Sequence, residues 1–565
     1  MPAERPLRVV LCWHMHQPEY RDLATGEYQL PWTYLHAVKD YVDMAAHLEA
    51  EPRARAVVNF APVLLVQLAD YAGQVRGFLR GERPLRDPLL AALARAALPT
   101  AIAPRAGLVR ACLRANEGRL IRRFPPYSRL AEMGRWLLAH PDALAYVDDQ
   151  YLADLLVWYH LAWLGETVRR TDARAQRLME KEASYSLHDR RELLALIGEL
   201  LAGVVPRYRA LAERGQVELA MSPHAHPILP LLLDLASARE AMPEAPLPRA
   251  ERYPGGLERA RWHLETGRAV FENAFGRAPA GCWPSEGAIS DETLRLLEAH
   301  GFRWAASGQN VLRNSFARAG LEPSARNLYR PWRLRDGSLA CFFRDDGLSD
   351  LIGFTYSGWH ADDAVADLLG HLARIAEACP GGIVPIILDG ENAWEHYPEN
   401  GYWFLRALYR RLAEHPALEP VTFADCLGPD DAPEPLEGVV AGSWVYGTLS
   451  TWIGDPDKNR GWELLIDAKR AWDTHAARVT DPARRARLEE QLGACEGSDW
   501  FWWFGDYNPA ETVSDFERLF RMHLANLYQM LGLEPPDELG HAFTHGRGRP
   551  QLGGVMRRAD ESASG

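Results

Sequence analysis

The stretch Gly382-Ile-Val-Pro-Ile-Ile-Leu-Asp-Gly-Glu-Asn-Ala-Trp-Glu395 has the pattern of a buried strand that ends in an acid. Its apolar run stops at Leu388, and Asp389 follows before a glycine. A carboxyl group held there lies beside apolar walls, so we expect a raised pKa, which suits a proton donor at neutral pH. Asp389 and Glu391 could share one strand face, and only one of them is expected to be the acid. The alternative is that Asp389 caps a turn or a helix, the more common role of an isolated strand-end Asp.

Six further apolar runs end in polar or aromatic residues in the same manner. Helical patterns lie between most of the seven runs, for example at Asp291–His300 and Asp362–Cys379. Strands that alternate with helices predict a parallel sheet, and polar residues at the strand ends predict a barrel with its active site on that face. The six runs are Arg8–Trp13, Ala54–Phe60, Gln216–Met221, Ala278–Trp283, Phe302–Ala306 and Ser338–Phe343.

The remaining segments predict helical additions to this α/β barrel. Residues 63–214 are rich in Leu, Ala and Arg at helical spacing, which indicates a helical insertion within a catalytic domain of residues 1–428. Asp430–Gly438 is rich in Pro and acidic residues and is predicted to link this domain to an α-helical C-terminal domain of residues 439–534. Residues 535–565 are rich in Gly, Arg and Ser and are expected to be a disordered tail. Helical patterns of the C-terminal domain cover Trp462–Arg478, Pro482–Leu492 and Val513–Leu531.

The composition narrows the partners and the compartment. A formal net charge of −13 argues against a nucleic acid or an anionic membrane as partner, because either would need a basic face. Seven Cys without a Cys-x-x-Cys pair indicate reduced thiols in a cytoplasmic protein, and we expect no signal peptide and no membrane span. The 19 Trp suit stacking on sugar rings, but Trp also fills hydrophobic cores.

A second strand-end acid follows the fourth run. In Gly281-Cys-Trp-Pro-Ser-Glu-Gly287 the acid is Glu286, and a carboxylate nucleophile needs this kind of exposed, fixed placement. Its alternative role is a cap for the helix that begins near Ser290. Two strand-end carboxyl groups in one barrel favour a glycosidase, because these enzymes place two carboxyls across the scissile bond, about 5 Å apart in the retaining class.

Three histidines also fall at strand ends. His14 and His16 follow the first run two residues apart and so point the same way, and His226 follows the third run. Together they could bind a metal, hydrogen-bond sugar hydroxyls or be satisfied core histidines, and the residues alone leave these roles open.

Two aromatic segments give weaker signals. Trp359-His360 lies in a loop near Arg344, Asp345 and Asp346, and this loop could line a cleft or simply turn. The block Trp500–Asp506 indicates packing at a domain junction, with Trp503 and Asp506 as candidate contacts at its rim.

Taken together, these segments resemble glycoside hydrolase family 57, from His14 to about Tyr528. Each of the family's five signature regions is weak alone, and the ordered set is specific. The Glu of the third region is the family's nucleophile and the Asp of the fourth is its acid/base, which correspond here to Glu286 and Asp389. The regions resemble His16–Pro18, Gly215–Leu219 with His226–Pro230, Trp283–Glu286, Leu388–Asn392 and Gly461–Leu465.

The resemblance implies a (β/α)7 barrel followed by a helical domain that closes the cleft, and retaining chemistry on α-glucans with no metal and no cofactor. Pro31–Tyr34 and His36–Tyr41 look most like the α-amylase and amylopullulanase branch, although His224 stands where an aromatic residue, typically Tyr, is expected. Because family members include glucanotransferases, a 4-α-glucanotransferase is the alternative. Substrate contacts are expected from His14, His16, Gln17, His226, Trp283, Trp359, Glu391, Trp394, Trp462 and Trp503.

Two rival functions belong to other classes. A metal-dependent hydrolase on a related barrel, such as an α-mannosidase or a polysaccharide deacetylase, would use the pair His14 and His16. Those enzymes have an Asp among the first-strand ligands, whereas Gln17 and Pro18 follow here. A non-catalytic glucan-binding protein is the other rival, and the presence of both strand-end acids argues against it.

Overall fold

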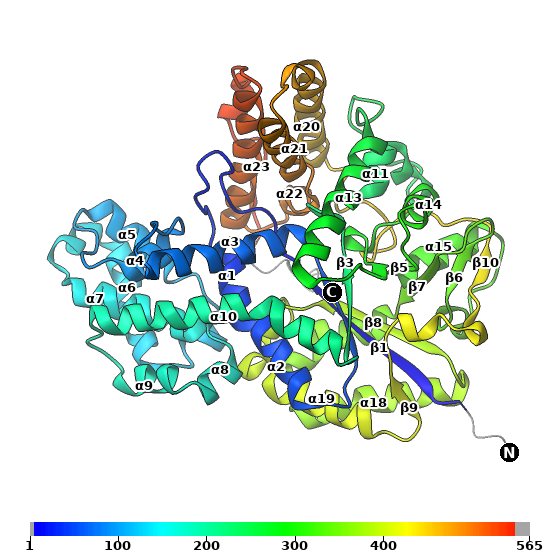
Figure 1. Cartoon of the computed structure of the whole chain (residues 1–565), viewed down its shortest axis with the longest axis horizontal. Helices are drawn as coiled ribbons and strands as arrows, with labels where there is room; N and C mark the ends of the chain where they lie inside the picture. The colour runs from blue at the N-terminus through cyan, green and yellow to red at the C-terminus, as the bar shows by residue number, and fades with distance from the viewer. Residues whose placement is uncertain (1–4, 549–565) are drawn as a thin grey trace.

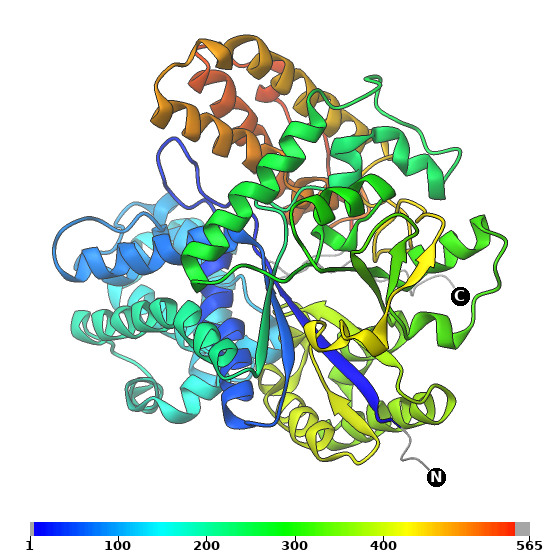
Figure 2. The same cartoon turned by 45° about the vertical axis from the view of Figure 1, so that its right-hand side comes forward.

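Seven parallel strands form the barrel, and they are the seven runs that the sequence predicts (Figures 1 and 2). The computed structural model describes residues 5–548. Neighbouring strands pair in the order β7-β5-β4-β3-β2-β1-β8. The N–H of Asp345 donates to the carbonyl oxygen of Pro385 at 2.8 Å and joins the two outer strands. The predicted (β/α)7 barrel is therefore confirmed. Its strands are β1 Leu7–Met15, β2 Ala56–Phe60, β3 Val217–Met221, β4 Gly281–Cys282, β5 Trp304–Gly308, β7 Ala340–Arg344 and β8 Ile383–Asp389.

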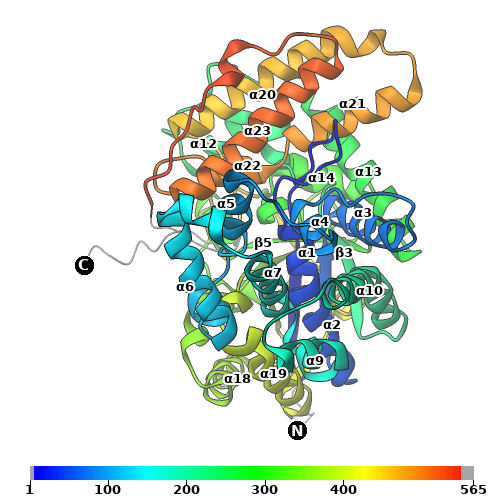
Figure 3. The ribbon, with the colours of Figure 1, turned by 90° about the vertical axis from the view of Figure 1, so that its left-hand side faces the viewer.

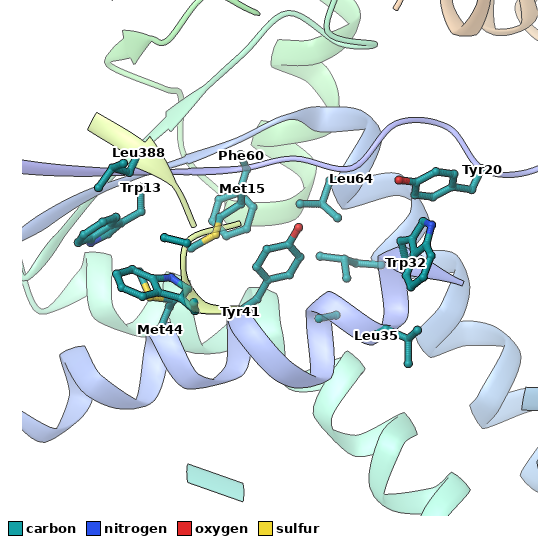
Figure 4. Packing of buried hydrophobic residues seen from close by; sticks show 14 of the residues in the cluster. Trp13, Met15, Tyr20, Trp32, Leu35, Tyr41, Met44, Phe60, Leu64 and Leu388 are labelled. Atoms are coloured by element: carbon teal, nitrogen blue, oxygen red, sulfur yellow. The ribbon is translucent and has the colours of Figure 1, made fainter. Parts of the chain in front are cut away.

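Alternation along each strand decides what faces the barrel interior. Val10 and Cys12 of β1 belong to one buried cluster with Ile387 of β8, whereas Trp13 and Met15 belong to the cluster shared with the outer helices. Figure 4 shows this outer packing, in which the β1 side chains face the helix that carries residues 32–50. Because side chains two apart share a face, His14 and Asp389 continue the inward-facing series at the mouth of the barrel.

Helices follow the strands and cover the outside of the barrel (Figure 1). Apolar residues at helical spacing turn toward the strands, as in α18, where Val365, Leu368 and Leu372 are buried. The helices of this domain outside the insertion are α1 Trp32–His36, α2 Val42–Ala50, α11 Leu229–Leu233, α12 Ala238–Ala241, α13 Gly256–Phe275, α14 Asp291–Ala299, α15 Gln309–Arg318, α16 Ala325–Leu328, α17 Asp346–Asp350, α18 Ala361–Ala378 and α19 Tyr402–Glu414.

The predicted helical insertion follows β2 and forms a lobe beside the barrel (Figure 3). Its long final helix begins with a capping box, in which Ser186 and Asp189 each satisfy a backbone N–H of the first turn. The insertion spans Pro62 to Glu213, close to the predicted residues 63–214. Its helices are α3 Pro62–Leu79, α4 Pro88–Ala94, α5 Ile102–Ala111, α6 Pro125–Ala139, α7 Asp149–Trp163, α8 Glu166–Thr171, α9 Ala173–Lys181 and α10 Leu187–Glu213.

Three short strands lie outside the seven. Strand β9 (Leu418–Pro420) pairs with β1, and β6 (Trp332–Leu334) pairs antiparallel with β7. Strand β10 (Glu434–Leu436) pairs with β6, so the predicted linker Asp430–Gly438 is instead partly an edge strand. An edge strand tolerates Pro because one side of its backbone needs no partner.

The C-terminal helices stack above the strand ends (Figure 1). The long loop after β1 rises beside them, where Nδ2 of Asn526 donates to Asp22 at 2.8 Å and His523 bonds the carbonyl oxygen of Glu19. On the other side, Arg259 and His263 of α13 both bond the buried carboxylate of Glu496. The helices are α20 Pro456–His475, α21 Pro482–Cys495, α22 Ser498–Trp503 and α23 Ala510–Met530.

The predicted disordered tail is partly ordered. Residues Asp537–Gly540 form a 3-10 turn, and Thr544 donates to Asp457 of α20 at 2.7 Å while accepting from the N–H of Gly505. These contacts fix residues 535–548 onto the helical domain, and the rest of the predicted tail, 549–565, lies outside the described residues. Among residues 5–548, no helix is both long and apolar enough to cross a bilayer.

Candidate active site

The strand ends open into a cavity of about 360 Å³. Both predicted catalytic acids, Glu286 and Asp389, line this cavity. The ends of β1, β7 and β8 form its floor, and the C-terminal side contributes Trp444, Tyr446 and Trp502. Of the predicted substrate contacts, the cavity wall includes His14, His16, Gln17 and Glu391.

Glu286 is held in a left-handed backbone conformation. It lies in a 3-10 turn, Ser285–Gly287, with φ of 59° and ψ of 22°. A residue with a side chain seldom takes this conformation, which is found at functional sites that the surrounding fold enforces. Nε1 of Trp444 donates to Oε2 of Glu286 at 3.1 Å, and Nδ1 of His226 lies 3.9 Å from Oε1. The turn therefore presents the carboxyl group toward hydrogen-bond donors.

Asp389 is the last residue of β8, and the following glycine brings it close to β1. A Cβ at Gly390 would lie 2.2 Å from the sulfur of Met15, so a larger residue here would displace the Met15 side chain. Nδ2 of Asn392 donates to Oδ2 of Asp389 at 2.7 Å. Strand pairing aligns Asp389 with His14, which sets the acid beside the histidine cluster.

Burial raises the pKa of both acids. The pKa of Asp389 rises to about 6, chiefly by desolvation, although the bond from Asn392 and the nearby charge of His16 act in the opposite direction. The pKa of Glu286 lies well above its ordinary value, first through desolvation and then through repulsion from Asp389 and Asp499. Burial of both groups and the repulsion on Glu286 therefore act against ionisation at this site.

Glu391 is a structural neighbour of the acids. Its Oε1 accepts hydrogen bonds from Nε2 of Gln17 at 3.1 Å, from the hydroxyl of Tyr41 at 3.2 Å and from the N–H of His16 at 3.3 Å. Burial, and then the charge of Asp389, raise its pKa well above the ordinary value. The three donors hold the chain after β8 against the chain after β1.

The three histidines stack on one another. Their ring centroids form a triangle, with 5.0 Å between His14 and His226, 3.9 Å between His16 and His226, and 5.6 Å between His14 and His16. One ring nitrogen of each histidine forms a hydrogen bond with another side chain. The partners are Asn59 for His14 at 2.7 Å, Asp499 for His16 at 2.8 Å and Ser498 for His226 at 2.9 Å.

The second ring nitrogen of each histidine has no partner in the structure. Burial lowers the pKa of His14 to about 3 and that of His226 well below its ordinary value, with further contributions from the neighbouring histidines. A neutral imidazole can donate to or accept from a hydroxyl group, so His14 and His226 can hydrogen-bond a polyhydroxylated ligand.

A different trio from the predicted one has the spacing of metal ligands. His16, His226 and Asp499 each offer one atom, and these atoms lie within 4.8 Å of one another. Three protein ligands are the number found in catalytic zinc sites. Here His16 Nε2 and Asp499 Oδ1 already bond each other directly at 2.8 Å, so a cation would have to replace that bond.

Most predicted tryptophan contacts lie elsewhere. Trp283 is fully buried inside the barrel, and Trp394 packs on Trp13 in the cluster shared with the outer helices. Trp462 stacks on Phe501, and Trp503 packs on Phe516. These four rings are core residues and not part of the cavity wall, because the same apolar surface that suits a sugar also stabilises a domain junction. Trp359 lines a second, separate pocket, and Asp506 is exposed.

Several site residues were missed by the sequence analysis. Asp499, Ser498 and Trp444 contact predicted site residues, yet they lie more than 150 residues after Glu286 in the chain. The one available signal was the aromatic block that begins at Trp500, directly after Asp499. In that block Trp502 lines the cavity, and Trp503 does not.

A barrel whose strand ends hold two buried carboxyl groups in one cavity has the architecture of a carbohydrate-active enzyme. The chain belongs to glycosyl hydrolase family 57, whose family model matches residues 10–434. This confirms the resemblance inferred from the sequence. No curated protein sequence matches the chain at a significant level.

Solved structures of other proteins share the fold over almost the whole chain. A branching enzyme of the same family from Pyrococcus horikoshii is 17% identical with a TM-score of 0.58, covering 93% of this chain and 89% of its own. The α-amylase AmyC from Thermotoga maritima is 12% identical with a TM-score of 0.57, covering 94% of each chain. A 4-α-glucanotransferase from Thermococcus litoralis is 12% identical with a TM-score of 0.51, covering 93% of this chain and 60% of its own.

Proposed function

We propose that the protein is a retaining glycoside hydrolase that cleaves α-glucosidic bonds in α-glucans. The observation that carries the proposal is that Glu286 and Asp389, two buried acids from different strand ends, line one cavity. The substrate class is supported by the similar structures, which are a branching enzyme, an α-amylase and a 4-α-glucanotransferase. Seven free cysteines support a cytoplasmic location.

In the proposed mechanism Asp389 is the general acid/base and Glu286 is the nucleophile. Asp389 gives its proton to the glycosidic oxygen while a Glu286 oxygen attacks the anomeric carbon, so the leaving chain departs and a glycosyl ester forms on Glu286. The carboxylate of Asp389 then takes a proton from water, whose oxygen attacks the anomeric carbon and frees Glu286.

The surroundings of Asp389 fit its role directly, whereas desolvation and the charge of Asp389 raise the pKa of Glu286 and act against its ionisation. Glu286 must be ionised to attack, and the donor Nε1 of Trp444 stabilises its anion. Asp389 must hold a proton, and its burial raises the pKa to about 6. The free ring nitrogens of His14 and His226 would hold the hydroxyl groups of the sugar whose bond is cleaved.

Within this mechanism we favour hydrolysis, as in the α-amylase and amylopullulanase branch, and keep a 4-α-glucanotransferase as the second candidate. Transfer differs only in the acceptor, because a sugar hydroxyl takes the place of water. The observation that favours transfer is a pair of exposed aromatic rings in the cavity wall, Phe354 and Tyr446, on which an acceptor sugar could stack. Products from maltoheptaose, pullulan and amylose, resolved by chain length, distinguish the two.

Azide rescue tests the two assigned roles. In Glu286→Ala, azide would attack an aryl α-maltoside from the vacated nucleophile side and give a β-glycosyl azide. In Asp389→Ala, the glycosyl ester still forms, and azide replaces water to give an α-glycosyl azide. Nuclear magnetic resonance of the products reads the anomeric configuration. The same configuration from both variants would contradict the assignment.

A further inference from the structure

A second pocket, of about 510 Å³, lies outside the barrel between the segment 356–362 and α19. We call it the outer pocket. Two half-exposed indoles flank it: Trp359, which follows the turn Tyr356–Gly358, and Trp403 in the first turn of α19. Figure 1 shows α18 and α19 side by side at the end of the molecule opposite the C-terminal helices.

Exposed tryptophan is uncommon in the described part of this chain. Trp136, Trp359 and Trp403 are its large exposed indoles, at 54%, 45% and 48%. Only the last two share a pocket among the cavities that we describe. Single exposed apolar residues need no explanation, but paired aromatic rings around a hollow are typical of a binding site.

Both rings are held in place by neighbours. The ring of Tyr356 meets the edge of Trp359, with centroids 5.3 Å apart. Nε1 of Trp403 donates to Glu399 at 2.8 Å, and the guanidinium of Arg170 lies over its ring at 5.2 Å. Rings that are fixed before binding lose little entropy when a ligand stacks on them.

The polar residues around the rings indicate the ligand class. The lining of the outer pocket also supplies hydrogen-bond donors and acceptors, from both cationic and anionic side chains. These residues are His360, Asp362, Arg406 and Arg410. A glucose ring combines an apolar face of C–H groups with a rim of hydroxyls, which matches aromatic faces bordered by mixed polar groups. A strongly acidic or apolar ligand would match this lining less well.

One short segment of the chain contributes to both the outer pocket and the catalytic cavity. Phe354 lines the catalytic cavity, and Tyr356, two residues later, lines the outer pocket. We propose that the outer pocket is a second α-glucan-binding site, which holds a distant part of the polysaccharide whose chain enters the cavity. The ligand class rests on the proposed function, whereas the pocket and its rings do not.

Binding is tested without turnover, in the Glu286→Gln background. Full-length Trp359→Ala/Trp403→Ala is compared with its parent by affinity electrophoresis in gels that contain amylopectin or glycogen. We expect about tenfold weaker binding, from two stacked rings that each contribute as much as an aromatic pair. Trp136→Ala, an equally exposed Trp in the insertion, is the matched control and should bind like the parent. Thermal unfolding of each variant confirms that it is folded.

A kinetic comparison completes the test in the background that retains Glu286. The ratio of kcat/KM for amylopectin to that for maltotriose should fall in the double variant, because only a long chain reaches both pockets. The second site is overturned if the double variant keeps both the gel retardation of its parent and the parent's ratio of kcat/KM values. It is also overturned if gel filtration shows that the substitutions change only self-association. If the double variant loses retardation relative to its parent but the wild-type protein cleaves no glucan, the proposed function fails and the second site stands.

Discussion

Nε1 of Trp444 donates a hydrogen bond of 3.1 Å to Oε2 of Glu286, and the N–H of Trp444 donates to the carbonyl oxygen of the same residue at 3.1 Å. Trp444 lies beyond residue 434, where the match to the family model ends. The segment between the barrel and the C-terminal helices therefore fixes the proposed nucleophile at both its backbone and its carboxyl group.

Replacing this indole should weaken the nucleophile. The hydrogen bond from Nε1 of Trp444 lowers the pKa of Glu286. Trp444→Phe keeps the backbone bond but removes this donor, so the pKa of Glu286 should rise further. Because Glu286 must be ionised, the acid limb of the kcat/KM profile should move to higher pH, and kcat/KM at neutral pH should fall about tenfold. A profile that keeps its shape would show that Trp444 only packs.

The opposite limb should respond to Asn392. Its hydrogen bond lowers the pKa of Asp389, which stands at about 6. Asn392→Ala removes the bond, so the pKa should rise and the acid should keep its proton to higher pH. The alkaline limb of kcat/KM should therefore move upward while the acid limb changes less. A downward shift would contradict the assignment of Asp389 as the proton donor.

Asp389 should also reduce the stability of the folded protein at neutral pH. Its pKa rises from an ordinary 3.8 to about 6 on folding, so ionisation is disfavoured in the fold by about 3 kcal/mol. This deficit is fully present above pH 6, shrinks as the pH falls toward 4 and is absent below the unfolded pKa. Asp389→Asn should raise Tm at pH 7.5, with a smaller gain at pH 4.5, while activity is lost. Equal Tm values at pH 7.5 would show that burial carries no such penalty.

The metal-dependent alternative makes a separate prediction. If His16, His226 and Asp499 position sugar hydroxyls, exhaustive treatment with a chelator should leave kcat/KM unchanged. Asp499→Ala should lower kcat through loss of the partner of His16, and added zinc should not restore it. Activity that disappears with the chelator and returns with zinc would establish a metal-dependent enzyme instead.

The barrel strands and the two acids at their ends were predictable because short, contiguous stretches of sequence identify them. Uninterrupted apolar runs identify buried strands, and an acid directly after such a run, as at Asp389, must lie at the strand end. The edge strand β10 was not predictable in this way, because its Pro and acidic residues are typical of a linker until β6 supplies a partner.

The helical side of the site was not predictable, because its residues meet the strand ends only through tertiary packing. His16 and Asp499 are 483 positions apart, and nothing local marks either as the partner of the other. The tryptophans were ambiguous for the same reason. Trp394 and Trp359 look alike in sequence, and only the fold buries one and exposes the other.

The attachment of the first long loop to the last long helix has a consequence for synthesis of the protein. His523 and Asn526 of α23 hold Glu19 and Asp22 of the loop after β1. These contacts cannot form until more than nine-tenths of the chain has been synthesised. In a partly synthesised chain this loop would lack its contacts with α23, and a protein truncated before residue 523 would lack both hydrogen bonds.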